Sequence, residues 1–125
     1  MTDERSLTGK RILVLEDDFY LASDEKTLLE RAGASVAGPF GSGCGAGDIA
    51  GAGPLDGAVV DINLGGGPSF DFARMLAGQG VPFVFVTGYD QAVVPEEFAN
   101  APRLEKPLRE RELIAVMTTL TAGSA

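Results

Sequence analysis

The sequence predicts an α/β domain in which strands and helices alternate around a parallel sheet. Apolar runs at 11–16, 57–62 and 82–87 show little alternation of polar and apolar residues, as strands buried on both faces do. Weaker strand candidates at 34–40 and 102–105 complete five β/α units. Right-handed crossovers arrange such units as a doubly wound sheet with helices on both faces.

Two of the predicted helices have a clear apolar face. The first has Asp17 or Asp18 as its capping residue and ends at Gly33. Its apolar face consists of Leu21, Leu28, Leu29 and Ala32. The last helix ends near 121, and its apolar face consists of Leu113, Val116, Met117 and Leu120.

Three further helices are predicted to be short. Ser69 can cap one that Gly78 and Gly80 stop, and its apolar residues are Phe72, Ala73 and Leu76. Six glycines in 41–53 limit a second helix to about 46–52, because glycine disfavours helix interiors. A third, within 90–99, is short or begins at Pro95.

These units predict a flavodoxin-like (βα)5 fold with strand order 2-1-3-4-5. In that order the switch point, where ligands bind, lies between the first and third strands. We expect one domain over 1–125, with its core at 10–121 and short tails at 1–9 and 122–125.

Composition excludes several classes of function. Eighteen acidic residues against ten basic ones give a net charge of -8, which argues against nucleic-acid binding. No apolar stretch approaches the roughly 18 residues of a membrane span, and the first ten residues carry no secretion signal. The lone Cys44 fits a reducing cytoplasm. Because the chain has no histidine, His-dependent nucleophiles are excluded, and any phosphohistidine must belong to another protein.

Chemically reactive side chains follow four of the predicted strands. Glu16-Asp17-Asp18, Asp61, Thr87 and Lys106 each stand at or just after the carboxyl end of a strand. Singly, the acids are ordinary helix caps or turn residues, and the lysine an ordinary surface charge. Because parallel strands bring these ends to one sheet edge, we interpret the group as a functional site.

The donor types favour Mg²⁺ beside a phosphoryl group. Carboxylates of Asp17 and Asp61, with the backbone carbonyl of Asn63, would supply the oxygen ligands that Mg²⁺ prefers. Asp61 is the candidate nucleophile, since carboxylates form aspartyl phosphates. The Lys106 ammonium would neutralise phosphoryl oxygens, and the Thr87 hydroxyl would donate to one of them.

The chain resembles a bacterial receiver domain of two-component response regulators over roughly 10–121. The resemblance is carried by RILVLEDD, VVDINLGGG, FVTGYD and RLEKP. It implies that Asp61 is the phosphoacceptor and that Glu16 and Asp17 are the acids of the metal site. It also implies that Thr87 is the switch hydroxyl, that Lys106 is the family's conserved lysine, and that Pro107 follows a cis peptide bond.

A finer resemblance is to the subgroup called FATGUY receivers, which implies a role in stress signalling. It rests on FVTGYD, PRLEKP and a Pro-rich, shortened fourth helix, with Val86 where the motif has alanine. Arg103 occupies the position of the usual aromatic switch residue. We therefore expect Tyr89 to move on phosphorylation and to reshape the surface of 88–100.

The resemblance implies a stand-alone, cytoplasmic response regulator, because no output domain follows the predicted core. Its expected partners are a histidine kinase or a histidine phosphotransfer protein, with a downstream response regulator as a further candidate. We expect relay, phosphate-sink or adaptor roles. No substrate turnover is expected beyond self-catalysed phosphoryl transfer and autodephosphorylation.

Two alternatives come from other classes. The stretch 41–46 satisfies the glycine fingerprint of nucleotide-binding modules, but it follows the second predicted strand instead of the first. A haloacid-dehalogenase-like phosphatase also uses an aspartyl phosphate. That family has D-x-D after its first strand, whereas Asp61 lies in D-x-N after the third.

Overall fold

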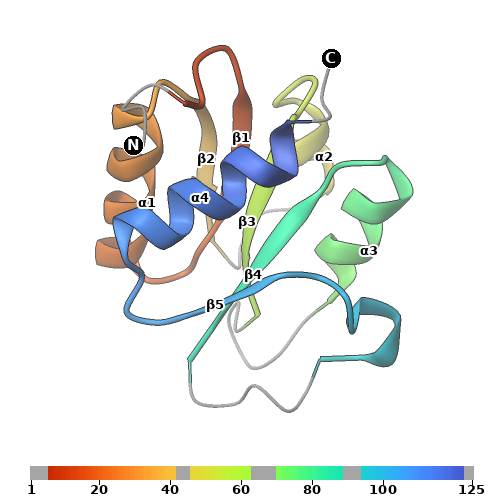
Figure 1. Ribbon diagram of the computed structural model, residues 1–125. Helices are drawn as coiled ribbons and strands as arrows, with labels where there is room; N and C mark the ends of the chain where they lie inside the picture. Colours follow the sequence, from red (N-terminus) through yellow and green to blue (C-terminus); the bar gives the residue numbers. More distant parts are fainter. Residues whose placement is uncertain (1–5, 42–45, 63–69, 89–93, 123–125) are drawn as a thin grey trace.

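A five-stranded parallel sheet lies between two layers of helices in the computed structural model (Figure 1), which describes residues 6–41, 46–62, 70–88 and 94–122. The strand order β2-β1-β3-β4-β5 confirms the predicted topology. The strands are β1 (Arg11–Leu15), β2 (Ser35–Phe40), β3 (Gly57–Asp61), β4 (Phe83–Thr87) and β5 (Arg103–Glu105).

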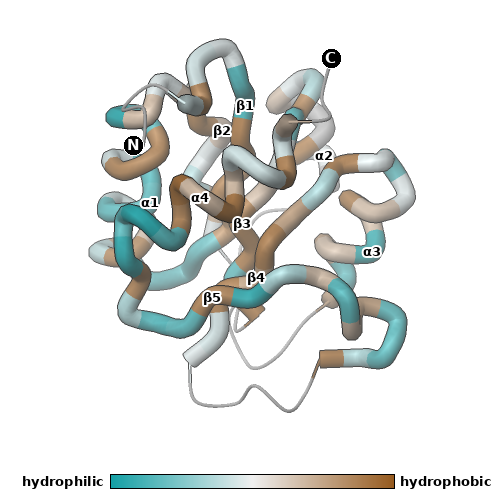
Figure 2. The backbone as a smooth tube through the Cα atoms, viewed as in Figure 1, coloured by the Kyte–Doolittle hydropathy of each residue, from teal (hydrophilic) through white to brown (hydrophobic). Residues whose placement is uncertain are grey.

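Alternate residues of the strands supply two separate cores, one on each face of the sheet. On one face, Val14 and Val84 pack with residues of α1 (Phe19–Arg31) and α4 (Glu110–Thr121). On the other, Leu15 and Phe85 pack with residues of α2 (Ala46–Ala50) and α3 (Asp71–Gly78). Most residues of β3 and β4 are hydrophobic (Figure 2), as expected for strands that are buried on both faces.

The caps of α1 follow the sequence prediction. The backbone N–H of Leu21 donates to Asp18 Oδ1 at 3.0 Å, so Asp18 is the capping residue of the two candidates. At the other end, Gly33 adopts a φ of +100°, the left-handed conformation that favours glycine after a helix. Glu16 and Asp17 are thereby fixed in the short connection between β1 and α1.

The short helices differ from expectation in detail. Helix α3 begins one residue later than predicted, with Phe70 as its capping residue; Ser69 lies outside the described residues. In 90–99, the described part holds only a 3-10 turn, η2 (Glu96–Phe98), which follows Pro95. The Phe98 ring is stacked on Phe70, with 6.2 Å between the ring centroids, and anchors this turn in the core.

No helix in the described ranges is long and apolar enough to cross a bilayer.

The close packing of β2 against β1 at Gly38 leaves no room for a side chain. Its φ is +95°, and a Cβ there would lie 2.8 Å from the backbone nitrogen of Phe40 and 3.0 Å from the carbonyl oxygen of Val14. We predict that Gly38→Ala lowers the free energy of unfolding by about 2 kcal/mol or more, measured by urea unfolding. The control Gly78→Ala, with open space around its Cβ, should be neutral or stabilising. Equal effects of the two substitutions would contradict this account.

Candidate functional site

The sheet brings four of the predicted site residues to one edge. Glu16 directly follows β1, Asp61 and Thr87 are the last residues of β3 and β4, and Lys106 directly follows β5. Register fixes their relative depth, because Asp61 pairs with Val86 and Thr87 pairs with Glu105. Glu16, Asp61 and Thr87 are all buried, with at most 3% of each residue exposed.

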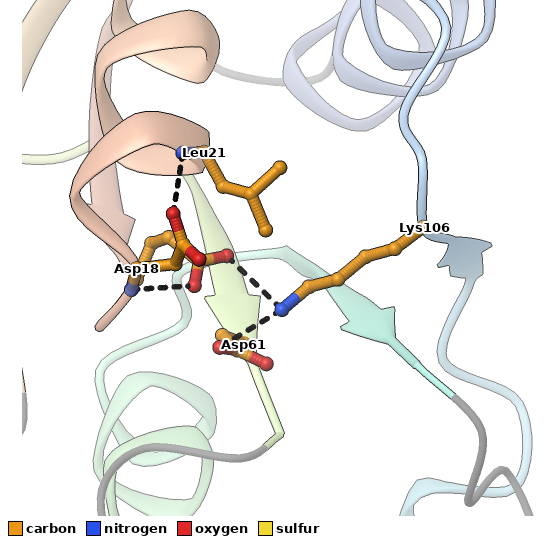
Figure 3. Close-up of polar contacts among 5 residues, drawn as sticks. Asp18, Leu21, Asp61 and Lys106 are labelled. Atoms are coloured by element: carbon orange, nitrogen blue, oxygen red, sulfur yellow. Dashed lines mark hydrogen bonds and ion pairs between the residues drawn. The ribbon is translucent and has the colours of Figure 1, made fainter.

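Lys106 joins two of these acids. Its Nζ lies 3.3 Å from Asp61 Oδ2 and 3.5 Å from Glu16 Oε1, and its side chain reaches across from the end of β5 (Figure 3). The backbone N–H of Lys106 donates to the carbonyl oxygen of Thr87 at 2.8 Å. The next peptide bond, Lys106–Pro107, is cis. The two ion pairs hold the ammonium beside the Asp61 carboxylate.

Burial and neighbouring charges set the protonation of this group. Burial, and then contact with the Asp61 carboxyl, raise the pKa of Glu16 to about 7. The Asp18 N–H opposes this by donating to Glu16 Oε2 at 3.1 Å. Burial alone would lower the pKa of Lys106, but Asp61 and Glu16 raise it above its usual value, so the lysine stays positively charged at neutral pH.

The other predicted site residues are less central in the described structure. Asp17 is exposed, and a Cβ at Gly41 would lie 3.0 Å from its Oδ1, so the carboxylate faces the end of β2. Arg103 is exposed at the start of β5. Asn63 and Tyr89 lie outside the described residues.

The donor set suits a hard cation such as Mg²⁺. Glu16 and Asp61 offer carboxylate oxygens at the sheet edge, and Asp17 adds a third from the rim. Glu16 Oε1 is buried, and its contact with a donor in the described residues is the ion pair with Lys106 Nζ at 3.5 Å, which is too loose to count as a hydrogen bond. Within those residues no three acids are gathered closely enough to hold a metal.

Sequence reasoning missed Glu25. This side chain lies on α1, is 1% exposed, and has two buried oxygens that accept no hydrogen bond from the described part of the chain. Burial first, and then Glu16, raise the pKa of Glu25 to about 9. The signal was present in the sequence, because Glu25 is four residues from both Leu21 and Leu29 and so falls on the apolar stripe.

Several solved structures are similar to this chain. SdrG from Sphingomonas melonis Fr1 has 31% sequence identity and a TM-score of 0.75 over 94% of this chain and 98% of its own. The BeF3-activated conformation of SdrG from Pseudomonas melonis Fr1 has 31% identity and a TM-score of 0.74, covering 89% of this chain and 95% of that one. A response regulator receiver protein from Burkholderia phymatum has 26% identity and a TM-score of 0.75, covering 93% and 98%. Comparison with family models and with curated proteins gave no match.

The raised pKa values predict that the metal-free protein loses stability as the pH rises. Glu16 and Glu25 titrate near 7 and 9 when folded, against 4.5 normally, so the folded state binds more protons than the unfolded state between these values. Their stabilisation is complete below pH 4.5 and is lost as the pH rises from there through about 7 for Glu16 and about 9 for Glu25. We expect a loss of about 1–3 kcal/mol in urea unfolding between pH 5 and pH 9 with a chelator present.

Two variants control this experiment. Glu25→Gln cannot ionise and should show a smaller loss, whereas Asp24→Asn, which changes an exposed acid of the same helix, should keep the wild-type profile. A free energy of unfolding that stays constant or rises from pH 5 to pH 9 in the metal-free wild type would refute the assignment.

Proposed function

We propose that this chain, which belongs to the receiver-domain family of response regulators, accepts a phosphoryl group on Asp61 and signals through the change that follows. The observation that carries the proposal is the placement of Asp61 at the sheet edge, with the Lys106 ammonium 3.3 Å from its carboxylate. A carboxylate held in this way can act as a nucleophile while the neighbouring cation neutralises the incoming phosphoryl oxygens.

In the proposed reaction, a carboxylate oxygen of Asp61 attacks the phosphorus of a phosphohistidine on another protein. The P–N bond breaks, the imidazole leaves, and an acyl phosphate forms on Asp61. Lys106 neutralises developing charge on the phosphoryl oxygens. Mg²⁺, held by Glu16, Asp17, Asp61 and the carbonyl of Asn63, would supply further neutralisation when bound.

Thr87 fits the role of a hydroxyl that senses the phosphoryl group. Its Oγ1 is buried at the end of β4 and has no hydrogen-bond partner in the described structure. Because an unmatched buried hydroxyl is unfavourable, the side chain is ready to donate to a new acceptor beside Asp61. Movement of Thr87 would then change the connection between β4 and η2.

The proposed partners follow from the receiver-domain family. The phosphoryl donor would be a histidine kinase or a histidine phosphotransfer protein in the cytoplasm, and because this chain has no histidine, the phosphohistidine would lie on that partner. A downstream response regulator could receive the group through the same kind of transfer protein. The net charge of -8 suits basic protein surfaces and does not suit nucleic acids.

We further propose membership of the FATGUY subgroup and its role in stress signalling. Two features support this: in the described part of 90–99 the chain forms a 3-10 turn, η2, and Arg103 stands in place of an aromatic switch residue. The remaining aromatic candidate for the switch is Tyr89. Tyr89→Ala should then abolish the phosphorylation-dependent NMR shifts of 94–100 and partner binding, while leaving phosphorylation of Asp61 intact.

Phosphoryl transfer tests the proposed function directly. We predict that wild-type protein with Mg²⁺ gains a phosphoryl group from at least one of a panel of autophosphorylated histidine kinases, detected by radiolabel and intact mass. Asp61→Asn, or a chelator, should abolish labelling, and Asp24→Asn should not affect it. Labelling that survives in Asp61→Asn would place the acceptor elsewhere, and no labelling from any donor would reduce the protein to a binding module.

Substitution of Thr87 separates phosphorylation from its consequence. We expect Thr87→Ala to accept the phosphoryl group but to lose most of the phosphorylation-dependent NMR shifts in 94–100, because the sensing hydroxyl is gone. Thr87→Ser keeps that hydroxyl and should restore the shifts. If Thr87→Ala responds like the wild type, the hydroxyl has no switching role.

A further inference from the structure

The connection from β4 to β5 is fastened to α3 by a half-exposed ion pair. The guanidinium of Arg74, on α3, donates from Nε to Glu97 Oε1 at 2.8 Å, and its Nη2 lies 2.7 Å from the same oxygen. Glu97 belongs to η2, which lies near α3 (Figure 1). Arg74 Nη1 also lies 3.4 Å from Asp71 Oδ1, three residues earlier on α3. Asp71 therefore helps to orient Arg74 toward η2.

On its buried side, η2 packs against aromatic rings from β4 and from the start of α3. The centroid of the Phe98 ring is 5.6 Å from that of Phe85 and 6.2 Å from that of Phe70. Phe85 lies two residues before Thr87 on β4, so the two side chains belong to the same face of the sheet. A shift of Thr87 would therefore disturb the surface on which η2 rests.

The two attachments of η2 differ in strength. Phe98 is buried among other rings, and such a side chain is costly to remove from the core. The side chains of Arg74 and Glu97 are 50% and 49% exposed, and ion pairs screened by water in this way contribute little. The ion pair can therefore open while Phe98 stays in place, as a latch that is released by a small free energy would.

The contacts around Asp61 are those expected before phosphoryl transfer. Lys106 pairs with both Asp61 and Glu16, and the Thr87 hydroxyl has no hydrogen-bond partner among the described residues. The ion pair between α3 and η2 is formed in this same conformation. Movement of Thr87 toward a phosphoryl group would change the face that supports η2, and the geometry of the ion pair would change with it.

We propose that the Arg74–Glu97 ion pair is a latch, which holds η2 against α3 and opposes the change that follows phosphorylation of Asp61. The inference rests on the proposed function, in which Asp61 accepts the phosphoryl group. Coupling between two equilibria is reciprocal, so if phosphoryl binding opens the latch, removal of the latch favours phosphoryl binding by the same factor. The latch sets how readily the domain is activated, although neither side chain touches the phosphoryl group.

The test measures equilibrium binding of beryllofluoride, which occupies the phosphoryl position on a carboxylate. Beryllofluoride is titrated into ¹⁵N-labelled protein at saturating Mg²⁺, and the bound fraction is obtained from the amide signals. The variants are Arg74→Gln, Glu97→Gln and the combination of both. Glu96→Gln is the matched control, since it removes the same charge from an exposed position in the same turn.

We expect Arg74→Gln and Glu97→Gln each to lower the half-saturating beryllofluoride concentration about two- to fivefold, as the loss of an exposed ion pair allows. The combined variant should match the single ones, because both substitutions remove the same interaction. Glu96→Gln should stay close to wild type. A long-range charge effect has a different pattern: loss of an acid would strengthen anion binding, and loss of the arginine would weaken it.

Amide hydrogen exchange reports on the latch alone. The N–H of Phe98 donates to the carbonyl oxygen of Pro95 at 2.9 Å within η2. Without Mg²⁺ or beryllofluoride, this amide should exchange about two- to fivefold faster in Arg74→Gln and in Glu97→Gln than in wild type, because η2 opens more often. Glu96→Gln should again match the wild type.

Unchanged or weaker beryllofluoride binding in either single variant would overturn the inference, and so would effects that multiply in the combined variant. Failure of the proposed function has another signature: neither wild type nor variants would bind beryllofluoride at Asp61, although the variants would still exchange faster at Phe98. The ion pair would then hold η2 without any role in activation, and the inference would fall together with the proposed function.

Discussion

The site depends on one ammonium group placed between buried carboxylates. Lys106 lies 3.3 Å from Asp61 and 3.5 Å from Glu16, and both acids are almost fully buried. Without a cation, two carboxylates about 4 Å apart repel each other by about 4 kcal/mol at an effective dielectric of 20. The Lys106 ammonium offsets this repulsion, and the same charge is available to a phosphoryl group. Structural and chemical requirements are met by a single side chain.

The fold holds Asp61, Thr87 and Lys106 firmly in place at the ends of their strands. Asp61 and Thr87 end strands that are buried on both faces, and Lys106 is tied to β4 through the carbonyl oxygen of Thr87. Between β4 and β5, the described residues contain one 3-10 turn, held by the Phe98 ring and by an ion pair between Arg74 and Glu97 at 2.7 Å.

Much of this could be predicted from sequence, because strand-end residues of a parallel sheet have to share an edge. The five β/α units predicted the strand order, and the runs ending at Asp61 and Thr87 predicted that these two residues lie at one edge of the sheet. The start of α3 was placed one residue early, since a serine is a better cap by side-chain chemistry than the phenylalanine that occupies the position. Glu25 was missed because the apolar face of α1 was assigned from its leucines and Ala32 alone, and the charges of Glu16 and Lys106 come near Glu25 only in the tertiary structure.

Neither alternative gained support: the glycine motif lies mostly outside the described residues, and the similar receiver proteins cover nearly the whole chain.

A crystal structure of the protein with Mg²⁺ and beryllofluoride would test the central claim most directly, because beryllofluoride mimics a phosphoryl group on a carboxylate. The account predicts beryllium bound to an Asp61 oxygen, with Lys106 Nζ and Thr87 Oγ1 contacting fluorides and Mg²⁺ between Glu16, Asp17 and Asp61. Beryllofluoride on another carboxylate, or an unmodified Asp61 still paired with Lys106 at saturating reagent, would contradict it.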